Sequence, residues 1–562
     1  MRLRFFLLVV LCACVASAAQ NAVPYSNQLV PASAVPGQGS FTLQVQGSNF
    51  AAGAAICWNG VPQATQVVSS SLVQATISAA DVAKVGTARV TVTNGGGQVS
   101  NALNFPIRRA WSSAAMALQP TLTSLGQSAV TGDFNGDGKM DLVTTNGKKG
   151  GLTLRMGKGD GTFLAGSTIR QGYYYDALVV GDFNGDGKLD IAASFPSLCG
   201  GCGGEPSFQL QVFLGAGDGN FTVVAPKYPF YGLPLAAGDF DGDGKLDLIV
   251  TGTDYYGDQW YPAVVRGKGN GLFEEGFSFH GYFDFAFPAI ADFNGDGKLD
   301  IAIPGYDYLP YGNPLTYVFM GNGDGSFQTA VQYASPQYFH YAAAAVDLNG
   351  DGKMDIATDG VQVLLNNGDG TFTNDANVNV SGSQLFGGVV AGDFNGDGKM
   401  DFATGAYANF TPNSGYLFLG NGDGTFQPTI VEGVDTVLQA ADFNGDGKLD
   451  LLTPGGIFVQ TAASLSPTSF NFGAVTTGTQ SQTTVTLTNI GLTIMTLKSV
   501  QISGASTYTQ TNNCGPTLAA GSSCAIQVAF LPTVFDQYYN ASLIVTVAGA
   551  PPSSMALTGF GF

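Results

Sequence analysis

The residues best suited to chemistry lie in an acidic motif that occurs seven times. It reads D-x-N-x-D-G-K-x-D, and the copies begin at Asp133, Asp182, Asp239, Asp292, Asp347, Asp393 and Asp442. Positions 1, 3, 5 and 9 carry side-chain oxygen atoms, and the lysine at position 7 can offer its backbone carbonyl. A set of hard oxygen ligands without Cys or His suits Ca²⁺ best, ahead of Mg²⁺ or Mn²⁺. We therefore predict up to seven calcium sites.

The predicted ligands occupy the same five positions in every copy, with Asp241 in place of Asn in the third. The glycines at positions 4 and 6 permit the sharp turn that brings the oxygens together. One copy would fit an ordinary Asp-Gly turn, but seven copies that all keep the oxygens argue against coincidence. The ligands are Asp133, Asn135, Asp137, Lys139, Asp141, Asp182, Asn184, Asp186, Lys188, Asp190, Asp239, Asp241, Asp243, Lys245, Asp247, Asp292, Asn294, Asp296, Lys298, Asp300, Asp347, Asn349, Asp351, Lys353, Asp355, Asp393, Asn395, Asp397, Lys399, Asp401, Asp442, Asn444, Asp446, Lys448 and Asp450.

The motif begins like an EF-hand loop but does not continue as one. An EF-hand requires a glutamate at position 12, and the residues there are Thr144, Ala193, Val250, Ile303, Thr358, Thr404 and Thr453. The flanking residues also read as strands rather than helices. Position 9 must therefore close the site.

The elements that position these loops follow from the repeat. The copies are 49, 57, 53, 55, 46 and 49 residues apart, and a second motif of the type G-x-G-D-G-x-F follows six of them. A period of about 40–50 residues with several strands predicts the blades of a β-propeller. Gly-Asp-Gly in the second motif is typical of a hairpin turn, and we do not assign a metal to it.

One repeat can be divided into four strands. Residues 287–293, 299–303 and 316–320 read as the first three, and Phe327 opens the fourth. The seventh repeat lacks the second motif and a fourth strand. We expect Ala110–Leu118 to supply that strand, so that residues 108–120 complete the last blade and close the ring, because closure removes two open sheet edges.

The repeats resemble FG-GAP (VCBS-type) repeats, the blades of integrin α-chain propellers and of many secreted bacterial proteins. The resemblance covers residues 108–461. It implies that Ca²⁺ lies in the hairpin between the first and second strands of each blade. It also implies that the phenylalanine at position 2, replaced by Leu348 in the fifth copy, packs between blades.

The flanking segments predict two further β-domains. Residues 20–107 contain GSNF, WNG and SNALNF and resemble an IPT/TIG immunoglobulin-like domain, while residues 462–562 contain CAIQVAFLPT and resemble the ASPM-SPD-2-Hydin type, also named choice-of-anchor D. The predicted fold class is all-β, a seven-bladed β-propeller flanked by two immunoglobulin-like β-sandwich domains. Neither flanking domain concentrates ionisable residues, so we expect no chemistry there.

Residues 1–19 form a secretory signal peptide. Arg2 and Arg4 precede an apolar run, and Ala16-Ser17-Ala18 is a small-residue cleavage site. The run is too short to span a membrane, and around Cys12 it faintly resembles a lipoprotein box. We expect a secreted, cell-surface or periplasmic protein without a transmembrane segment in the mature chain.

Five cysteines remain after removal of the signal, and export permits disulfides. Cys514 and Cys524 flank a turn and are predicted to form one. Cys199 and Cys202 suit a small loop disulfide, with a redox or metal pair as the alternative. Cys57 lies in an apolar strand and is predicted to be a buried thiol.

The formal net charge of −19 is concentrated in the motif copies, whose 22 aspartates and seven lysines account for −15 of it. Seven Ca²⁺ ions would nearly neutralise these loops. Strong acidity argues against nucleic acid or an anionic membrane as a partner. The chain has only 2 histidines, His280 and His340, and we give neither a catalytic role.

Aromatic residues point to a binding face. Sixteen of the 22 tyrosines lie between residues 173 and 341, mostly in loops expected on the face opposite the calcium loops. Exposed tyrosine and tryptophan suit a protein or a stacked carbohydrate. The alternative is that some of these aromatic residues only pack long loops. The predicted ligand-binding residues are Tyr174, Tyr231, Tyr256, Trp260, Tyr282, Tyr308 and Tyr338.

A polysaccharide-active enzyme, lyase or hydrolase, is the alternative function. It would need an acid and a base on the same face. Loop carboxylates are available there, but no arrangement singles out a pair, and a purely structural envelope protein is a third possibility. The candidate carboxylates are Asp176, Asp254, Asp258, Asp284 and Asp307.

Overall fold

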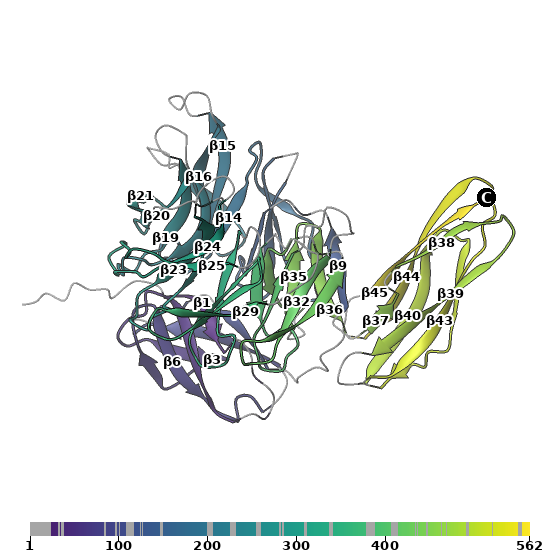
Figure 1. Ribbon diagram of the computed structural model, residues 1–562, viewed down its shortest axis with the longest axis horizontal. Coiled ribbons are helices and arrows are strands. Elements are labelled where there is room, and N and C mark those ends of the chain that lie inside the picture. The colour runs from purple at the N-terminus through teal and green to yellow at the C-terminus, as the bar shows by residue number, and fades with distance from the viewer. Residues whose placement is uncertain are drawn as a thin grey trace, which may run out of the picture.

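The computed structural model describes residues 24–562 apart from a set of short segments. These are 32–33, 35–36, 38, 84–85, 96–97, 101, 108–116, 124, 126–127, 147–149, 199–205, 225–231, 254–259, 280–282, 284–285, 308–311, 336–340, 378–387, 406–413, 433, 435, 445–447, 462, 468, 490–493, 520 and 549–552. The described part is all-β, as predicted, and its strands form eleven sheets (Figure 1).

The N-terminal domain is a sandwich of two four-stranded sheets. Alternating apolar residues of both sheets meet between them, with Leu43, Ile56 and Phe105 fully buried. One sheet has the order β1 (Tyr25–Val30), β2 (Phe41–Ser48), β6 (Leu72–Ile77), β5 (Thr65–Val67), and the other β4 (Val61–Pro62), β3 (Ala55–Trp58), β7 (Gly86–Thr93), β8 (Leu103–Ile107).

The central domain is a seven-bladed propeller, and each blade is an antiparallel four-stranded meander. Blade 1 consists of β10 (Ala129–Gly132), β11 (Asp141–Thr145), β12 (Leu152–Arg155) and β13 (Ser167–Arg170). Blade 2 consists of β14 (Ala177–Gly181), β15 (Asp190–Leu198), β16 (Pro206–Gly215) and β17 (Phe221–Val224). Blade 3 consists of β18 (Leu233–Gly238), β19 (Asp247–Thr253), β20 (Trp260–Gly267) and β21 (Phe273–Ser278).

The remaining blades repeat this order. Blade 4 consists of β22 (Ala289–Ala291), β23 (Asp300–Tyr306), β24 (Pro314–Phe319) and β25 (Val331–Ala334). Blade 5 consists of β26 (Ala343–Val346), β27 (Asp355–Thr358), β28 (Gln362–Asn366) and β29 (Phe372–Asn377). Blade 6 consists of β30 (Val389–Gly392), β31 (Asp401–Thr404), β32 (Ser414–Gly420) and β33 (Phe426–Glu432).

Blade 7 is assembled from both ends of the domain. Its strands β34 (Gln439–Ala441), β35 (Asp450–Thr453) and β36 (Gly456–Thr461) are followed in space by β9 (Ala117–Thr123), which pairs antiparallel with β36. The closing strand therefore lies further along the chain than the expected Ala110–Leu118. In blade 4, Phe327 makes only an isolated bridge with Gly321, and the fourth strand begins later, at Val331.

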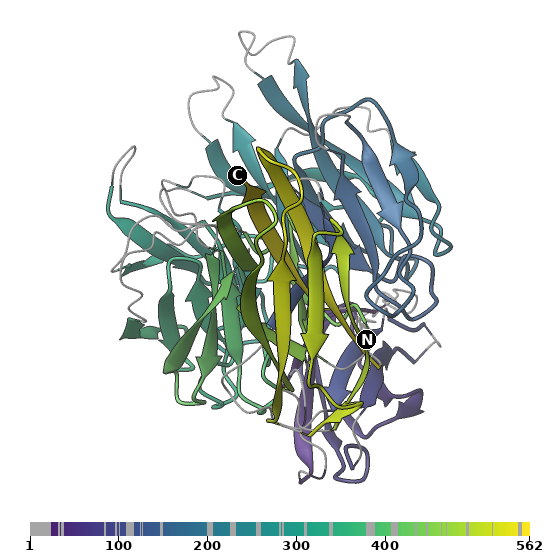
Figure 2. The same ribbon diagram turned by 90° about the vertical axis from the view of Figure 1, so that its right-hand side faces the viewer.

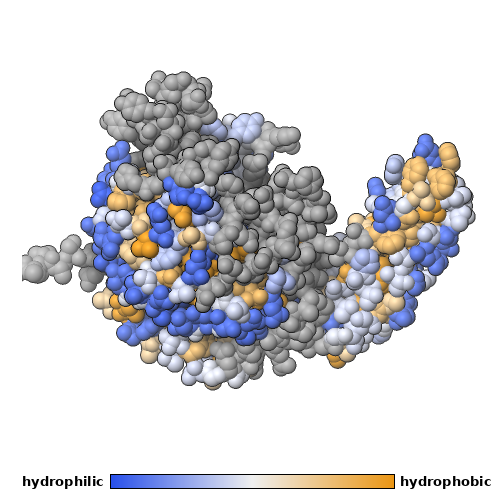
Figure 3. All heavy atoms as spheres, viewed as in Figure 1, coloured by the Kyte–Doolittle hydropathy of each residue, from blue (hydrophilic) through white to orange (hydrophobic). Residues whose placement is uncertain are grey.

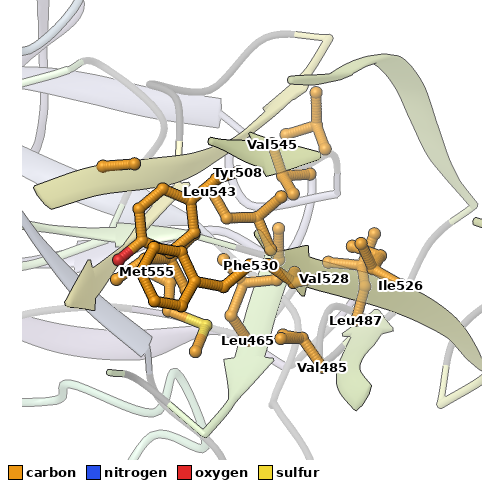
Figure 4. Packing of buried hydrophobic residues seen from close by; sticks show 14 of the residues in the cluster. Leu465, Val485, Leu487, Tyr508, Ile526, Val528, Phe530, Leu543, Val545 and Met555 are labelled. Atoms are coloured by element: carbon orange, nitrogen blue, oxygen red, sulfur yellow. The ribbon is translucent and has the colours of Figure 1, made fainter. Parts of the chain in front are cut away.

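The C-terminal domain is a second sandwich, which lies beside the propeller in Figure 1 and in front of it in Figure 2. Phe530, Tyr508 and Leu543 meet between its sheets (Figure 4). One sheet has the order β37 (Ala463–Ser466), β39 (Ser481–Asn489), β43 (Ser523–Phe530), β41 (Tyr508–Asn512), and the other β38 (Ser469–Val475), β45 (Ser553–Gly561), β44 (Gln537–Val547), β40 (Met495–Gly504), β42 (Thr517–Leu518).

Candidate metal sites on the loop face of the propeller

Each acidic motif forms the hairpin between the first and second strands of its blade. In blade 1 the motif runs from the end of β10 to the start of β11, and the glycines at positions 4 and 6, Gly136 and Gly138, have φ of 74° and 82°. That left-handed conformation is strained for any residue with a Cβ atom. Six copies are fully described, whereas Asp446 of the seventh lies outside the described residues.

Side-chain oxygens at positions 1, 3 and 5 turn inward along the loop. Asp133 accepts hydrogen bonds from the N–H groups of Asp137 (3.0 Å) and Gly138 (2.8 Å). Asn135 Oδ1 accepts from Asp137 (2.9 Å), and Asp137 Oδ1 accepts from Lys139 (3.0 Å). The same pattern recurs in blades 2, 4, 5 and 6. These bonds hold the oxygens of one loop close together.

The aspartate at position 9 is fully buried in all seven blades. In blade 4, Asp300 Oδ2 accepts from the N–H of Phe293 (2.9 Å), and Oδ1 accepts from the N–H of Gly321 (2.8 Å). The carboxylate thus ties the acidic loop to the start of the second motif, a role that the sequence analysis missed. Each oxygen retains a lone pair that a cation could share.

Among the described residues, three carboxylates meet in blade 3. One oxygen from each of Asp239, Asp241 and Asp247 lies within 4.8 Å of the others. Asp239 is 6% exposed, and its buried Oδ1 has no hydrogen-bond partner. Leaving a buried carboxylate oxygen without a partner is costly. The oxygen donor set and this atom fit a hard divalent cation.

Burial is the main cause of the pKa shifts of the aspartates at position 9. It raises the pKa of Asp190, Asp247 and Asp300 to about 7, because desolvation disfavours the charged form. Neighbouring aspartates of the same loop raise it further, while the backbone N–H bonds oppose the shift.

In blades 1 to 5 the lysine at position 7 pairs with the aspartate at position 5. Lys139 Nζ lies 3.2 Å from Asp137, and Lys298 Nζ lies 3.3 Å from Asp296. The predicted role of this lysine is only that of a carbonyl ligand, yet its side chain also offsets part of the loop charge. The pairs are partly exposed, so each contributes little to stability.

The second motif supplies turns that bind the neighbouring blade. Asp324 Oδ1 accepts from the N–H of Ser326 (3.0 Å), as in a hairpin turn. The N–H of Gly325, in the same turn, donates to the carbonyl of Phe240 in blade 3 (3.0 Å). Equivalent bonds join blades 2 to 1, 3 to 2 and 1 to 7 through Gly219, Gly271 and Gly161.

Phenylalanines at position 2 pack at the same junctions. Phe134 meets Phe221 of the next blade edge to face, with ring centroids 5.8 Å apart, and Phe293 meets Phe372 in the same way at 5.4 Å. The packing between blades that the resemblance implies is therefore present. The acidic loop and the second motif of each repeat therefore lie on the same face of the propeller. We name this face the loop face.

Only part of the predicted aromatic face is described. Tyr174 is 57% exposed, and Tyr173 is 38% exposed with its ring under the guanidinium of Arg170. Tyr175 is buried instead, and its hydroxyl donates to Gln211 (2.9 Å). Tyr231, Tyr256, Tyr282, Tyr308 and Tyr338 lie outside the described residues, as does the side chain of Trp260.

The candidate carboxylates of the alternative enzyme are not brought together within the described residues. Asp307 accepts hydrogen bonds from the backbone and side chain of Asn313 (2.7 Å each). These bonds hold its carboxylate within its own loop. Asp176 belongs to a different blade, blade 2. Asp254, Asp258 and Asp284, and the histidines His280 and His340, lie outside the described residues.

The described cysteines lie in the two sandwich domains. Cys514 and Cys524 form a disulfide that closes the turn between β41 and β43. Cys57 is a buried free thiol in β3. Cys199 and Cys202 lie outside the described residues.

Comparison with known proteins locates two families in the chain. FG-GAP-like repeats match residues 133–193, 239–303, 308–358, 357–404 and 406–453. The HYDIN/CFA65/VesB-like Ig-like domain matches residues 462–559. No curated protein matches this sequence.

Two solved structures show a distant similarity. A protein of unknown function from Porphyromonas gingivalis is 10% identical, with 47% of this chain and 90% of that chain covered and a TM-score of 0.16. The secreted serine protease VesC from Vibrio cholerae is 11% identical, with coverages of 60% and 68% and a TM-score of 0.18. Similarity at this level transfers nothing to the present chain.

Among the described residues, no helix has the length and hydropathy needed to span a bilayer.

The structure is a propeller whose blades carry acidic hairpins, followed by a sandwich. The chain therefore contains five matched FG-GAP-like repeats and a C-terminal HYDIN/VesB-type Ig-like domain.

Proposed function

We propose that this protein is an exported, calcium-stabilised β-propeller that binds a surface protein or a glycan through its aromatic loops. The acidic hairpins carry the calcium part of the proposal. In the six fully described copies they bring side-chain oxygens of one loop close together, and in blade 3 a buried carboxylate oxygen lacks a partner. Bound Ca²⁺ would supply structural charge neutralisation rather than catalysis. The basic and apolar start of residues 1–19 supports export.

The calcium sites can be tested by calorimetric titration of the metal-free protein with CaCl₂. We expect saturable binding at several sites and one fewer site in Asp239→Asn, which removes the charge at the unpartnered oxygen. Asp324→Asn is the matched control, because its turn uses a single side-chain oxygen that asparagine retains. Absence of binding heat in the wild type would refute the calcium proposal.

The binding part rests on the exposed tyrosines at blade 2. Tyr174 offers a large flat surface with few rotatable bonds and a polar tip, which suits stacking on a sugar or packing in an interface. Its exposure of 57% leaves that surface available to a partner.

Immobilised glycans and cell-surface proteins provide the screen for a partner. We expect Tyr174→Ala to weaken the interaction at least tenfold, and Tyr538→Ala, an 80% exposed tyrosine of the C-terminal domain, to leave it unchanged. Equal loss in both variants would contradict a binding site on the propeller. Turnover of a bound glycan would favour the polysaccharide-active alternative.

A further inference from the structure

The N-terminal sandwich contacts the loop face of the propeller beneath blades 3 and 4. Ser71 Oγ donates a hydrogen bond to the carbonyl of Gly297 (3.2 Å), which is position 6 of the acidic loop in blade 4. Figure 1 shows β1, β3 and β6 of this sandwich below β23 and β25. Two segments more than 200 residues apart in sequence are therefore in direct contact.

The glycines at position 6 show how close this contact is. A Cβ atom built on Gly244 of blade 3 would lie 2.3 Å from Asn49 Oδ1, and one built on Gly297 would lie 3.0 Å from the Cβ of Ser69. The equivalent glycines of blades 1 and 5, Gly138 and Gly352, have no atom within 4 Å of such a Cβ. The contact is thus confined to part of the ring.

Apolar residues of β1 extend the same contact. Tyr25 packs against the cluster of blades 2 and 3 that contains Phe183, and Val30 packs against the cluster of blades 4 and 5 that contains Phe293. Both phenylalanines occupy position 2 of an acidic loop. The N-terminal sandwich therefore touches the loops or loop-anchoring clusters of blades 2, 3 and 4.

The touched glycines also position the first cation ligand. The N–H of Gly297 donates to Asp292 Oδ2 (2.7 Å), and the N–H of Gly244 donates to Asp239 Oδ2 (3.1 Å). A contact that fixes the backbone at position 6 consequently fixes the aspartate at position 1. Blade 3, where Asp239 Oδ1 is buried without a partner, lies within this contact.

We propose that the N-terminal sandwich is a cap on the acidic loops of blades 2, 3 and 4, and that its docking and divalent-cation binding in those loops stabilise each other. This proposal rests on the proposed calcium sites. It adds that the N-terminal sandwich is the domain that packs against three of them. A cation that orders a loop presents a fixed surface to the cap, and the docked cap lowers the cost of ordering the loop for the cation. Linkage makes the two effects equal in size.

Hydrogen–deuterium exchange of the full chain with saturating CaCl₂ and after metal removal tests this coupling. We expect metal removal to speed exchange in the acidic loops and at the cap residues around Asn49 and Ser71, but not within the buried strand β3. A response of the loops without the cap would overturn the coupling and leave the calcium proposal intact. Unchanged exchange in the loops as well would overturn both.

A pair of glycine variants distinguishes loss of the contact with the cap from backbone strain within the acidic loop. Gly244→Ala and Gly352→Ala place the same methyl group at φ of 85° and 84°, and each glycine N–H donates to the aspartate at position 1. Only the first methyl group would clash with the cap. We expect Gly244→Ala to speed exchange at Asn49 and Ser71 at least fivefold more than Gly352→Ala, and equal exchange would overturn the docking contact.

A milder variant covers the case in which Gly244→Ala fails to fold. Ser71→Ala removes the hydrogen bond to Gly297 without straining the backbone. We expect it to weaken calcium binding at a subset of sites by two- to fivefold and to leave the remaining sites unchanged. Unaltered calcium affinity at every site, together with unaltered exchange in the cap, would overturn the proposal.

Discussion

At the scale of single residues, the aspartate at position 9 is the most constrained group of each repeat. Asp300 is fully buried, and its two oxygens accept N–H bonds from separate segments of the blade. The same arrangement recurs at Asp190 and Asp355. This carboxylate therefore connects two segments of the blade without the help of a cation.

Replacing Asp300 by asparagine should lower the free energy of unfolding by about 1–3 kcal/mol. The amide retains one acceptor oxygen but turns an NH₂ group toward a buried N–H donor, so one hydrogen bond is lost and a donor is left unsatisfied. Urea unfolding monitored by intrinsic fluorescence measures the change. Asp324→Asn, exposed and with its single acceptor oxygen kept, should change stability by less than about 0.5 kcal/mol.

The raised pKa values predict an unusual pH dependence for the metal-free protein. Asp190, Asp247 and Asp300 have a pKa of about 7 in the folded state, against 3.8 for an unperturbed aspartate. Folding therefore favours their protonated form, and the stabilisation present at low pH is lost as the pH rises toward 7. The melting temperature of metal-free protein should rise as the pH falls from about 8 to about 5.5.

Calcium should reverse that trend, since the cation binds the charged carboxylates. In saturating CaCl₂ the melting temperature should fall over the same pH interval as protons compete for the ligands. Thermal unfolding followed by circular dichroism in both conditions provides the test. Parallel pH profiles with and without calcium would contradict the assignment of these aspartates to cation sites.

At the scale of elements, each blade is attached to its neighbour through the loop face. Asn366 shows the connection in blade 5, where its amide donates to the carbonyls of Phe293 in blade 4 (2.8 Å) and Met354 (2.9 Å). Gln460 makes the corresponding bond from blade 7 to Phe394 of blade 6 (3.1 Å). The second motif or its substitute thus joins blades as well as strands.

Asn366→Ala should lower the free energy of unfolding by about 1–3 kcal/mol, because it leaves buried carbonyls of two blades without donors. The side chain of the neighbouring Asn367 bonds within its own exposed turn, to Thr371 and Thr373. Asn367→Ala should therefore change stability by less than about 0.5 kcal/mol. Chemical unfolding of the two variants measures the difference, and similar losses would show that the blade junction has no special role.

The sequence predicted the repeated elements well because each is specified locally. Glycines of positive φ and oxygen side chains at fixed spacing define the acidic loop within nine residues. The closing strand was harder to place, since β9 is an outer strand whose register depends on β36. Pro120 pairs with Phe458 at a register shift, a position that an edge strand tolerates.

Contacts between distant segments could not be predicted from one sequence. The bond from Gly219 to Phe134 and the contact of Ser71 with Gly297 join residues that no local pattern relates. The position-9 aspartates were predicted as ligands, but their bonds to the second motif depend on the spacing of strands within the folded blade. Such contacts arise only when the ring is assembled.

At the scale of the whole molecule, the negative charge is concentrated in the propeller. The acidic loops lie in the propeller, whereas the C-terminal sandwich, which has no copy of the motif, exposes Phe535 (72%) and Tyr538 (80%). Figure 3 shows apolar residues at the end of this sandwich that lies away from the propeller. Of the net charge of −19, −15 belongs to the motif copies. Cations bound there would act on the propeller and on the N-terminal sandwich that contacts its loops, but not on the C-terminal sandwich.

Calcium removal should therefore destabilise the propeller but not the C-terminal sandwich. At a ligand concentration one hundred times Kd, each site stabilises the folded state by about 2.7 kcal/mol. Several sites in one cooperative ring should thus lower its melting temperature by more than about 10 °C when metal is removed. Differential scanning calorimetry should show this shift, while the transition of the C-terminal sandwich, which contains no copy of the acidic motif, stays in place. A uniform shift of both transitions would indicate a general ionic effect, and an unmoved propeller transition would mean that its fold needs no cation.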